Sequence, residues 1–262
     1  MPARAKPIRP VTYAHDFQQS LRHRPDPGST SRLPGHLTLS TAMQSPPPYL
    51  VPHSQEEITL LYEDPDLLLV RKPDLLLSVP GRHPLNKDCL ITRLQQRHPT
   101  ASIVHRLDLD TSGIMVIPLN KPTHAHISRQ FQQRRVRKSY HAIVFGIVEL
   151  DCGEIDLPIA RDWQNRPRQK ICHERGKSAL THFTVLSREV DRTRLLLQPV
   201  TGRSHQLRIH RREIGHPILG CDMYAHEEAL GMAGRLMLHA SSLAFDHPTT
   251  GEWLQGSCPA PF

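Results

Sequence analysis

Proline is spread unevenly along this chain, and its distribution decides where a fold can begin. Ten of the 24 prolines lie in the first 54 residues, three of them in a row at 46–48. Proline fixes its own backbone angle and donates no amide hydrogen bond, so it interrupts both helices and sheets. The same segment has no sustained apolar period that could be buried. We therefore predict a disordered, basic extension over 1–54 and one folded domain over 55–262.

The charge balance points to a polyanionic partner only weakly. The chain holds 33 basic and 25 acidic residues, a net charge of +8. Half of that excess lies in residues 1–42, which contain six Lys or Arg and only two Asp. The folded part is therefore only mildly basic. The extension is either without function, with Met43 as an alternative start, or a basic arm that helps to hold nucleic acid.

The cysteines and the hydropathy pattern predict a cytoplasmic location. Five cysteines are scattered along the chain without a C-x-x-C pair, which is typical of reduced thiols rather than of a disulfide framework or a zinc ribbon. No apolar run approaches the roughly 20 residues that a membrane span needs. The basic start of the chain is not followed by the apolar segment of a secretory signal. We expect no membrane contact and no obligate protein partner.

The folded part mixes short apolar runs with a few helical segments. Strands are predicted at 58–64, 66–72, 113–118, 140–148, 180–186, 194–200, 236–245 and 252–254. One helix is expected to follow a cap at Asn86 and end near Pro99, a second to follow Asn120, and a third to follow Ser204 and end at Gly215. Because the helices do not alternate regularly with the strands, the fold class is α+β, with a mixed, largely antiparallel sheet flanked by helices.

Several common catalytic motifs are absent from the sequence. It contains no G-x-x-x-x-G-K-[ST] loop, no G-x-G-x-x-G, no H-E-x-x-H and no G-x-S-x-G. The 18 histidines include His124-x-His126 and a His205/His210 pair, but neither has a matching set of cysteines or carboxylates. We therefore predict neither a metal site nor a cofactor.

One polar segment, HRLDLDTSG at 105–113, leads directly into the apolar run GIMVIP. By itself such a segment is a turn in which Asp, Ser and Thr side chains bond their own backbone. Its order of residues, however, resembles the H-R-L-D-x-x-T-S-G signature of the RluA family of RNA pseudouridine synthases.

Three further blocks resemble that family in the same order, so the resemblance extends over 55–262. They are Lys72-Pro73 with Ser78-Val79-Pro80-Gly81, then Lys138-Ser139-Tyr140, and finally 201–210 followed by 215–220. With no recognisable S4-type domain ahead of the core, and with the run DWQNRP at 162–167, the chain is most similar to short members of the family.

The resemblance implies a pseudouridine-synthase catalytic domain that isomerises uridine in structured RNA loops, in tRNA, 23S rRNA or both, without a cofactor. It implies that Asp108 is the catalytic carboxylate and Tyr140 the active-site tyrosine. A nearby guanidinium favours an ionised carboxylate, and the resemblance assigns that role to Arg208, with Arg203 as the alternative. Arg106 is the candidate to fill the stack that a flipped base leaves. Whether the carboxylate attacks C1′, adds to C6 or waits for loss of the C2′ proton stays open.

Some positions near these blocks have a structural interpretation or depart from the family pattern. Asp110 is expected to be a turn carboxylate, and the basic run at 129–138 to be a solvated helix face or a phosphate contact through Arg129, Arg134 and Arg135. Arg71 and Leu75 stand where the family tends to have Asn and Gly, which indicates a different turn. Cys221, followed by Asp222, stands where an Asp is common.

The sequence leaves two other functions as alternatives. A non-catalytic RNA-binding or folding factor could keep the fold, although binding alone does not require a carboxylate, which repels phosphate. A glycosidase or nucleosidase would need a second acid at a suitable spacing, and the sequence offers no clear one.

Overall fold

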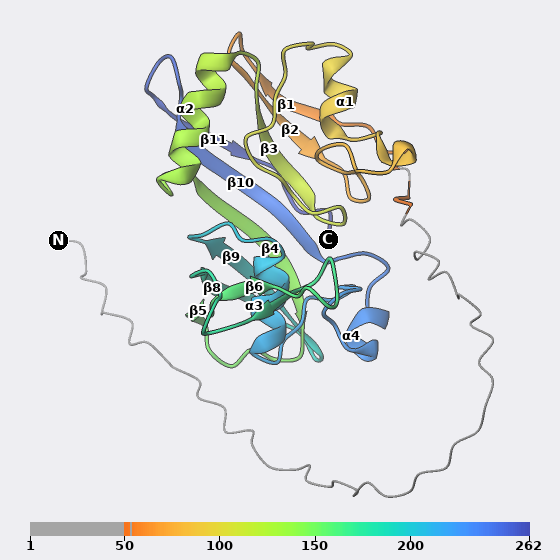
Figure 1. Ribbon diagram of the computed structural model, residues 1–262. Coiled ribbons are helices and arrows are strands. Elements are labelled where there is room, and N and C mark those ends of the chain that lie inside the picture. The colour runs from red at the N-terminus through yellow and green to blue at the C-terminus, as the bar shows by residue number, and fades with distance from the viewer. Residues whose placement is uncertain (1–49, 53) are drawn as a thin grey trace, which may run out of the picture. The chain divides into compact units, whose positions relative to one another are not determined.

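The computed structural model describes residues 50–52 and 54–262 (Figure 1). The predicted disordered extension lies almost wholly outside these residues, as does Met43. The few residues before 55 that are described contact the domain: the Val51 N–H donates to the Asn86 side chain at 3.0 Å, and the Ser54 carbonyl accepts from Arg93 at 2.7 Å.

Nine strands of the described chain form one sheet in the order β1-β2-β3-β10-β4-β9-β8-β5, with β11 paired to β10. Only β3 and β10 run parallel, and every other neighbouring pair is antiparallel. The strands are β1 (Thr59–Glu63), β2 (Leu67–Lys72), β3 (Ser112–Pro118), β4 (Arg137–Phe145), β5 (Cys152–Asp156), β8 (Leu180–Arg188), β9 (Arg192–Pro199), β10 (Leu238–Asp246) and β11 (Trp253–Ser257). The α+β prediction with a mixed, largely antiparallel sheet is confirmed.

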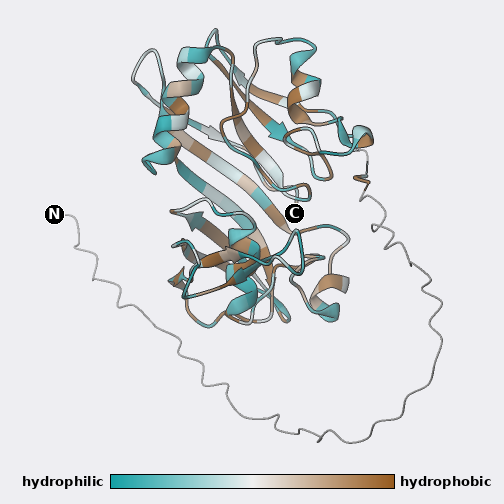
Figure 2. Ribbon diagram, in the orientation of Figure 1, coloured by the Kyte–Doolittle hydropathy of each residue, from teal (hydrophilic) through white to brown (hydrophobic). Residues whose placement is uncertain are grey.

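Short helices and one separate hairpin complete the domain. They are η1 (Pro84–Asn86), α1 (Leu90–Gln95), α2 (Lys121–Gln132), α3 (Gln206–Glu213) and α4 (Glu227–Gly231), with the hairpin strands β6 (Ile159–Arg161) and β7 (Gln169–Ile171). Figure 1 shows α1 and α2 beside the half of the sheet that holds β1–β3, and α3 beside the other half. The ribbon of α2 is largely teal in Figure 2, as expected of a helix that turns one face to solvent.

Two large apolar clusters pack against the sheet, one for each half. The first is built on β2, β3, α1 and α2 and includes the fully buried Met115 and Phe245. The second is built on β4, β8, β9 and α3 and includes Leu195 and Leu197. Tyr140, on the central strand β4, packs against both clusters. Tyr140 therefore lies where the two halves of the sheet meet.

The helix α2 begins as the sequence predicts. The Asn120 side chain accepts the Thr123 N–H at 2.9 Å, and Pro122 lies in the first turn. Such a cap satisfies one of the amides that have no partner inside the helix.

The predicted cap of the first helix is wrong. Asn86 ends the short helix η1, and α1 starts at Leu90, after Cys89. The Leu90 N–H is bonded to the Leu77 carbonyl at 2.7 Å, and the Thr92 hydroxyl accepts the Cys89 N–H at 3.1 Å. The helix therefore begins where a tertiary contact and a threonine satisfy its first amides.

The predicted cap of the third helix is also wrong. The residue before α3 is His205, which has a left-handed backbone (φ 55°), and Ser204 lies one residue outside. The side chain of Gln206 reaches back instead, accepting the Arg203 N–H at 3.0 Å and the Thr201 hydroxyl at 2.7 Å. The end of α3 agrees with the prediction, because Gly215 follows it with φ 83°.

The sequence did not reveal β5, the hairpin strands or α4, and β4 starts three residues earlier than expected, at Arg137. Strands β5, β6 and β7 are short and carry few apolar residues, and β5 is mostly exposed at the end of the sheet. Backbone pairing, rather than an apolar pattern, defines them.

Gly113 allows the one parallel pair of the sheet to form. Its φ is 126°, and a Cβ placed on it would lie 2.3 Å from the Ala240 carbonyl oxygen of β10. Any side chain would therefore separate β3 from β10.

Candidate active site

A cleft of about 890 Å³ opens where the two halves of the sheet meet. Its walls come from the loop 104–111, the end of α2, the start of β4 and the segment 199–208. The structure brings all four predicted site residues, Arg106, Asp108, Tyr140 and Arg208, into this cleft.

Asp108 and Arg208 face each other inside the cleft. Arg208 Nη1 lies 3.8 Å from Asp108 Oδ2. The arginine side chain is 1% exposed, whereas that of Asp108 is 32% exposed. Arg203, the alternative partner, donates instead to the Ser178 carbonyl at 3.0 Å. The cleft therefore presents a reachable carboxylate beside a buried cation.

The far side of the Arg208 guanidinium is fixed by the residues that depart from the family pattern. Arg208 Nη2 donates to Asp222 at 2.6 Å, and Nε donates to the Cys221 sulfur at 3.2 Å. Burial alone lowers the pKa of Arg208, but Cys221, Asp108 and Asp222 together raise it above the ordinary value. The cation therefore persists although the side chain is buried. Its Nη1 makes no hydrogen bond and points toward the carboxylates.

Asp110 lies as close to Arg208 as Asp108 does. Its Oδ2 is 3.7 Å from Arg208 Nη1. Burial raises the pKa of Asp110, and the nearby carboxylates Asp108 and Asp222 add to that effect while Arg208 opposes it. Asp110 is thus more than a local turn residue, because it shares the buried cation.

Tyr140 reaches the cleft from the middle of β4. Burial raises the pKa of its phenol, and the charge of Asp108 raises it further. The hydroxyl is therefore protonated at neutral pH and carries a proton that it can donate to a hydrogen bond.

Backbone anchors hold the residues on both sides of Asp108. The Ser78 hydroxyl donates to the Leu107 carbonyl at 2.8 Å and accepts the Leu107 N–H at 3.2 Å. On the other side, Lys72 Nζ donates to the Leu109 carbonyl at 3.1 Å. These two anchors come from the blocks of sequence that precede the signature, which explains why those blocks belong to the site.

Lys72 itself is fully buried and has three acceptors. Besides Leu109 it bonds the carbonyls of Pro73 and Leu76, both at 2.7 Å. An ammonium group has three N–H donors, so these contacts fit the protonated form. Burial lowers the pKa of Lys72 to about 7, while the nearby carboxylates, Asp74 first, favour the charge.

His105, the first residue of the signature, has a structural role. Its Nε2 accepts the Val116 N–H of β3 at 3.1 Å, and its ring stacks on Phe131 of α2 with centroids 4.8 Å apart. Burial, together with the charge of Lys138, lowers the pKa of His105 to about 3. A neutral histidine therefore joins the signature loop to β3 and α2.

Basic side chains surround the carboxylate. Arg106, Arg134, Lys138 and Arg203 all line the cleft. Burial lowers the pKa of Lys138 to about 8, so it still carries a charge at neutral pH. Arg135, in contrast, pairs with Asp246. Of the basic run at the end of α2, Arg134 is the arginine that faces the cleft.

His205 is held in the cleft wall by a tyrosine. Its Nδ1 lies 2.7 Å from the Tyr224 hydroxyl, which accepts the Gln169 N–H at 2.8 Å. The phenol can therefore donate to Nδ1, which leaves the Nε2–H of a neutral ring. Burial lowers the pKa of His205.

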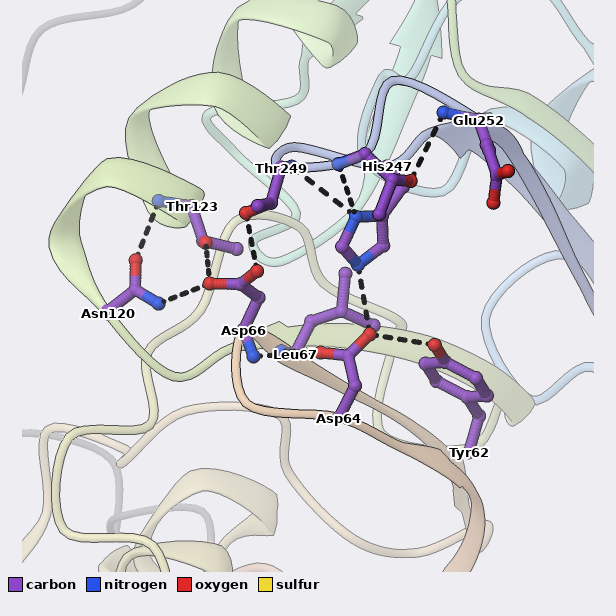
Figure 3. A network of polar contacts seen from close by, with 10 residues as sticks. Tyr62, Asp64, Asp66, Leu67, Asn120, Thr123, His247, Thr249 and Glu252 are labelled. Atoms are coloured by element: carbon purple, nitrogen blue, oxygen red, sulfur yellow. Dashed lines mark hydrogen bonds and ion pairs between the residues drawn. The ribbon is translucent and has the colours of Figure 1, made fainter.

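A separate polar cluster could in principle hold a metal ion, at the turn between β1 and β2 (Figure 3). It consists of Asp64, Asp66 and His247. Asp64 already accepts bonds from Tyr62 and His247, at 2.7 and 2.9 Å, and His247 Nδ1 accepts backbone N–H groups. The ligand atoms are thus engaged by the protein, and the cluster fits a clamp between the β1–β2 turn and the end of β10.

Among the described residues, none of the helices has the length and apolar character that a membrane crossing requires.

Comparison with known proteins shows the family to which the chain belongs. The family model "RNA pseudouridylate synthase" matches residues 66–213. The "Dual-specificity RNA pseudouridine synthase RluA" of Yersinia pestis is 52% identical over 204 residues, which cover 78% of this chain and 99% of that protein. The protein of the same name from Escherichia coli K12 is 46% identical, over 80% and 97% of the two chains.

Among solved structures, "Human RNA Pseudouridylate Synthase Domain Containing 1" superposes with a TM-score of 0.68 and 32% identity, covering 80% of this chain and 86% of that one. "Human RNA Pseudouridylate Synthase Domain Containing 4" gives a TM-score of 0.63 and 26% identity, with 78% and 88% coverage. The chain belongs to the RNA pseudouridylate synthase family, a family of isomerases that act on RNA.

Sequence reasoning did not reveal how several residues support Asp108 and Arg208. Ser78 and Lys72 were noticed only as parts of a resemblance, and Asp222 only as a displaced acid. Local spacing carried no signal for these contacts, because each joins segments far apart in the chain.

Proposed function

We propose that this chain converts specific uridines to pseudouridine in the loops of two kinds of RNA, tRNA and 23S rRNA, with Asp108 as the catalytic carboxylate. The observation that carries the proposal is the reachable Asp108 carboxylate beside the buried Arg208 in a cleft lined by basic residues. The dual specificity named for the relatives, which match this chain along nearly their whole length, supports two classes of substrate. Such RNAs imply a cytoplasmic location.

The chemistry fits the groups in the cleft. The N1–C1′ bond breaks, the uracil turns, a C5–C1′ bond forms, C5 loses a proton and N1 gains one. Atoms and electrons balance without an oxidant, a reductant or a second substrate, so the reaction itself requires no cofactor. A carboxylate that acts on the ribose or the base can start the sequence. The protonated phenol of Tyr140 can pack on the uracil and donate a hydrogen bond.

The target base must leave its stack to reach the cleft. Extrusion costs a few kcal/mol and is easiest in unpaired loops. Arg106 is exposed at the cleft, and its planar guanidinium suits both the vacated stack and a phosphate. Arg134 and Lys138 can neutralise backbone phosphates nearby.

Release of tritium from RNA labelled at uridine C5 tests the proposal, since C5 loses its hydrogen only when it becomes the glycosidic atom. Transcripts of tRNA and rRNA stem-loops are offered to the wild type, to Asp108→Ala and to Asp110→Ala. We expect release by the wild type, none by Asp108→Ala, measurable turnover by Asp110→Ala, and RNA affinities within a few-fold of one another. No release by the wild type despite measurable RNA binding would favour the non-catalytic RNA-binding factor.

A further inference from the structure

The hairpin β6–β7 exposes a tryptophan beside the cleft. Trp163 lies in the loop between the two strands and is 64% exposed. Large aromatic side chains are usually mostly buried, so an aromatic ring left in solvent is a candidate contact site. The hairpin forms its own two-stranded sheet outside the main one.

Arginines, rather than apolar neighbours, surround this ring. The Arg166 guanidinium lies 4.0 Å from the centroid of the Trp163 ring, and that of Arg161 lies 5.1 Å away. Arg168 and Lys170 add two more positive charges within the same ten residues, against the single acid Asp162. The combination of an exposed aromatic ring with clustered cations suits a nucleotide, whose base stacks and whose phosphate is negative.

The β7 side of the hairpin loop meets the wall of the cleft. Pro167 lines the same cleft as Asp108. The Gln169 N–H donates to the Tyr224 hydroxyl, which holds His205 of the cleft wall. Trp163 belongs to the same loop as Pro167, so RNA that enters the cleft can reach it.

We infer that Trp163 is a stacking platform for an unpaired base of the RNA loop other than the target uridine, with Arg161 and Arg166 neutralising the phosphates on either side. This inference rests on the proposed function, since the same RNA places its target in the cleft. The platform would contribute to recognition outside the catalytic centre, because stacking accepts any base while the geometry of the loop decides which one reaches the ring.

The second tryptophan of the chain provides a matched control. Trp253 of β11 is 46% exposed and also has an arginine near its ring, Arg137 at 5.2 Å. Successive residues of a strand point to opposite faces, and Lys138 and Tyr140 of β4 line the cleft. Arg137 and Trp253 therefore lie on the other face of the sheet.

Equilibrium binding of a fluorescent stem-loop RNA tests the platform with Trp163→Ala, Trp163→Phe and Trp253→Ala of the full chain. We expect Trp163→Ala to raise Kd by roughly 5- to 150-fold, the effect of losing one base–aromatic stack. Trp163→Phe retains a ring and should recover most of that affinity, and Trp253→Ala should bind like the wild type. Circular dichroism confirms that each variant is folded. Equal Kd values for Trp163→Ala and Trp253→Ala would overturn the inference.

An abasic scan identifies the contact. Each loop nucleotide except the target is replaced in turn by an abasic site, and Kd is measured with the wild type and with Trp163→Ala. At the stacked position the two changes should not add, because both remove the same contact. Additive effects at every position would contradict the stacking platform.

Tritium release separates this inference from the proposed function. Release by the wild type together with unchanged binding by Trp163→Ala overturns the platform alone. No release from any RNA, together with weakened binding by Trp163→Ala, supports the platform and overturns the isomerase.

Discussion

The Ser78 hydroxyl bonds both the N–H and the carbonyl of Leu107, the residue that precedes Asp108. A single side chain thus fixes the backbone on one side of the proposed catalytic carboxylate. Ser78 lies 29 residues before Leu107 in the chain, so this contact exists only in the folded protein.

Replacing Ser78 should slow the reaction more than it weakens RNA binding. Ser78→Ala leaves both backbone groups of Leu107 without this partner, so Asp108 is less well positioned. A misplacement of about 1 Å can cost on the order of 100-fold in rate, and we expect kcat to fall about 10- to 100-fold with Kd for RNA nearly unchanged. Single-turnover tritium release measures the rate. Ser102→Ala, which removes a hydroxyl bonded to His124 away from the cleft, should react like the wild type.

Asp222 should control the orientation of the Arg208 guanidinium. Asp222→Ala removes the partner at 2.6 Å from Nη2 of the buried guanidinium. Hydrogen bonds to charged groups contribute about 1.5–3 kcal/mol, so we expect kcat to fall on the order of tenfold or more. The effect is expected to be large because Arg208 is buried, although the Asp222 side chain is itself exposed.

A double variant provides the rescue. In Cys221→Asp with Asp222→Ala, the carboxylate moves to the position whose sulfur now accepts from Arg208 Nε at 3.2 Å. We expect this pair to recover most of the rate that Asp222→Ala loses. Single-turnover assays measure both rates. If Asp222→Ala reacts as fast as the wild type, or if the double variant is no faster than Asp222→Ala, Asp222 does not orient Arg208.

Leu75 offers a position where the protein can be stabilised. Its φ is 54°, in the left-handed region that favours glycine, and its side chain is 41% exposed. The turn thus keeps a glycine-like conformation although the glycine is missing. Left-handed backbone costs an L-residue about 1–2 kcal/mol, and glycine loses more chain entropy on folding.

We therefore expect Leu75→Gly to raise the free energy of unfolding by about 0.5–1 kcal/mol, measured by urea denaturation. Leu85→Gly is the control, because Leu85 is also exposed but lies in η1 with a negative φ. That variant should be destabilised. A loss of stability in Leu75→Gly would show that the Leu75 side chain contributes more than its backbone strain costs.

The clamp around Asp64 should make stability depend on acidic pH (Figure 3). Burial acts to raise the pKa of Asp64, but bonds from Tyr62, from the amides of Asp66 and Leu67 and from His247 lower it below the ordinary 3.8. A lowered pKa in the folded state contributes stability that is fully present above the ordinary value and is lost as the pH falls through the folded value.

Asp64→Asn removes that contribution. We expect it to cost about 2 kcal/mol at pH 7, and the difference from the wild type should shrink below about pH 4. Urea denaturation between pH 2.5 and about pH 7 measures it. Asp191→Asn is the control, because the exposed side chain of Asp191 pairs with the adjacent Arg192 at the surface, and it should change stability little at any pH. A constant difference across this range would contradict the ionic role of Asp64.

The order of residues along the chain was sufficient to predict the sheet class and most strands, and the resemblance that it carries led to four residues of the cleft. Runs such as 66–72 and 113–118 carry enough apolar side chains to define buried strands without knowledge of their partners. The signature at 105–113 pointed to Asp108 and the block at 201–210 to Arg208, and both side chains line the cleft. Asn120 was recognisable as a cap because a cap and its helix are adjacent in sequence.

Tertiary structure decided the features that depend on distant partners. Asn86 and Ser204 looked like caps, but the first amide of α1 is bonded to the Leu77 carbonyl and that of α3 to the Arg203 carbonyl. The strands of the β6–β7 hairpin are short and polar, so no pattern revealed them or the exposure of Trp163.

The sequence by itself determined which chemical groups the protein contains and which segments can be buried, because both properties depend on residue type and short-range periodicity. The tertiary structure decided which groups meet: Arg208 between Asp108 and Asp222, Ser78 against Leu107. The reason is physical. Hydrogen bonds and ion pairs act over a few ångströms, and only the packing of the sheet brings residues that lie tens of positions apart within that range.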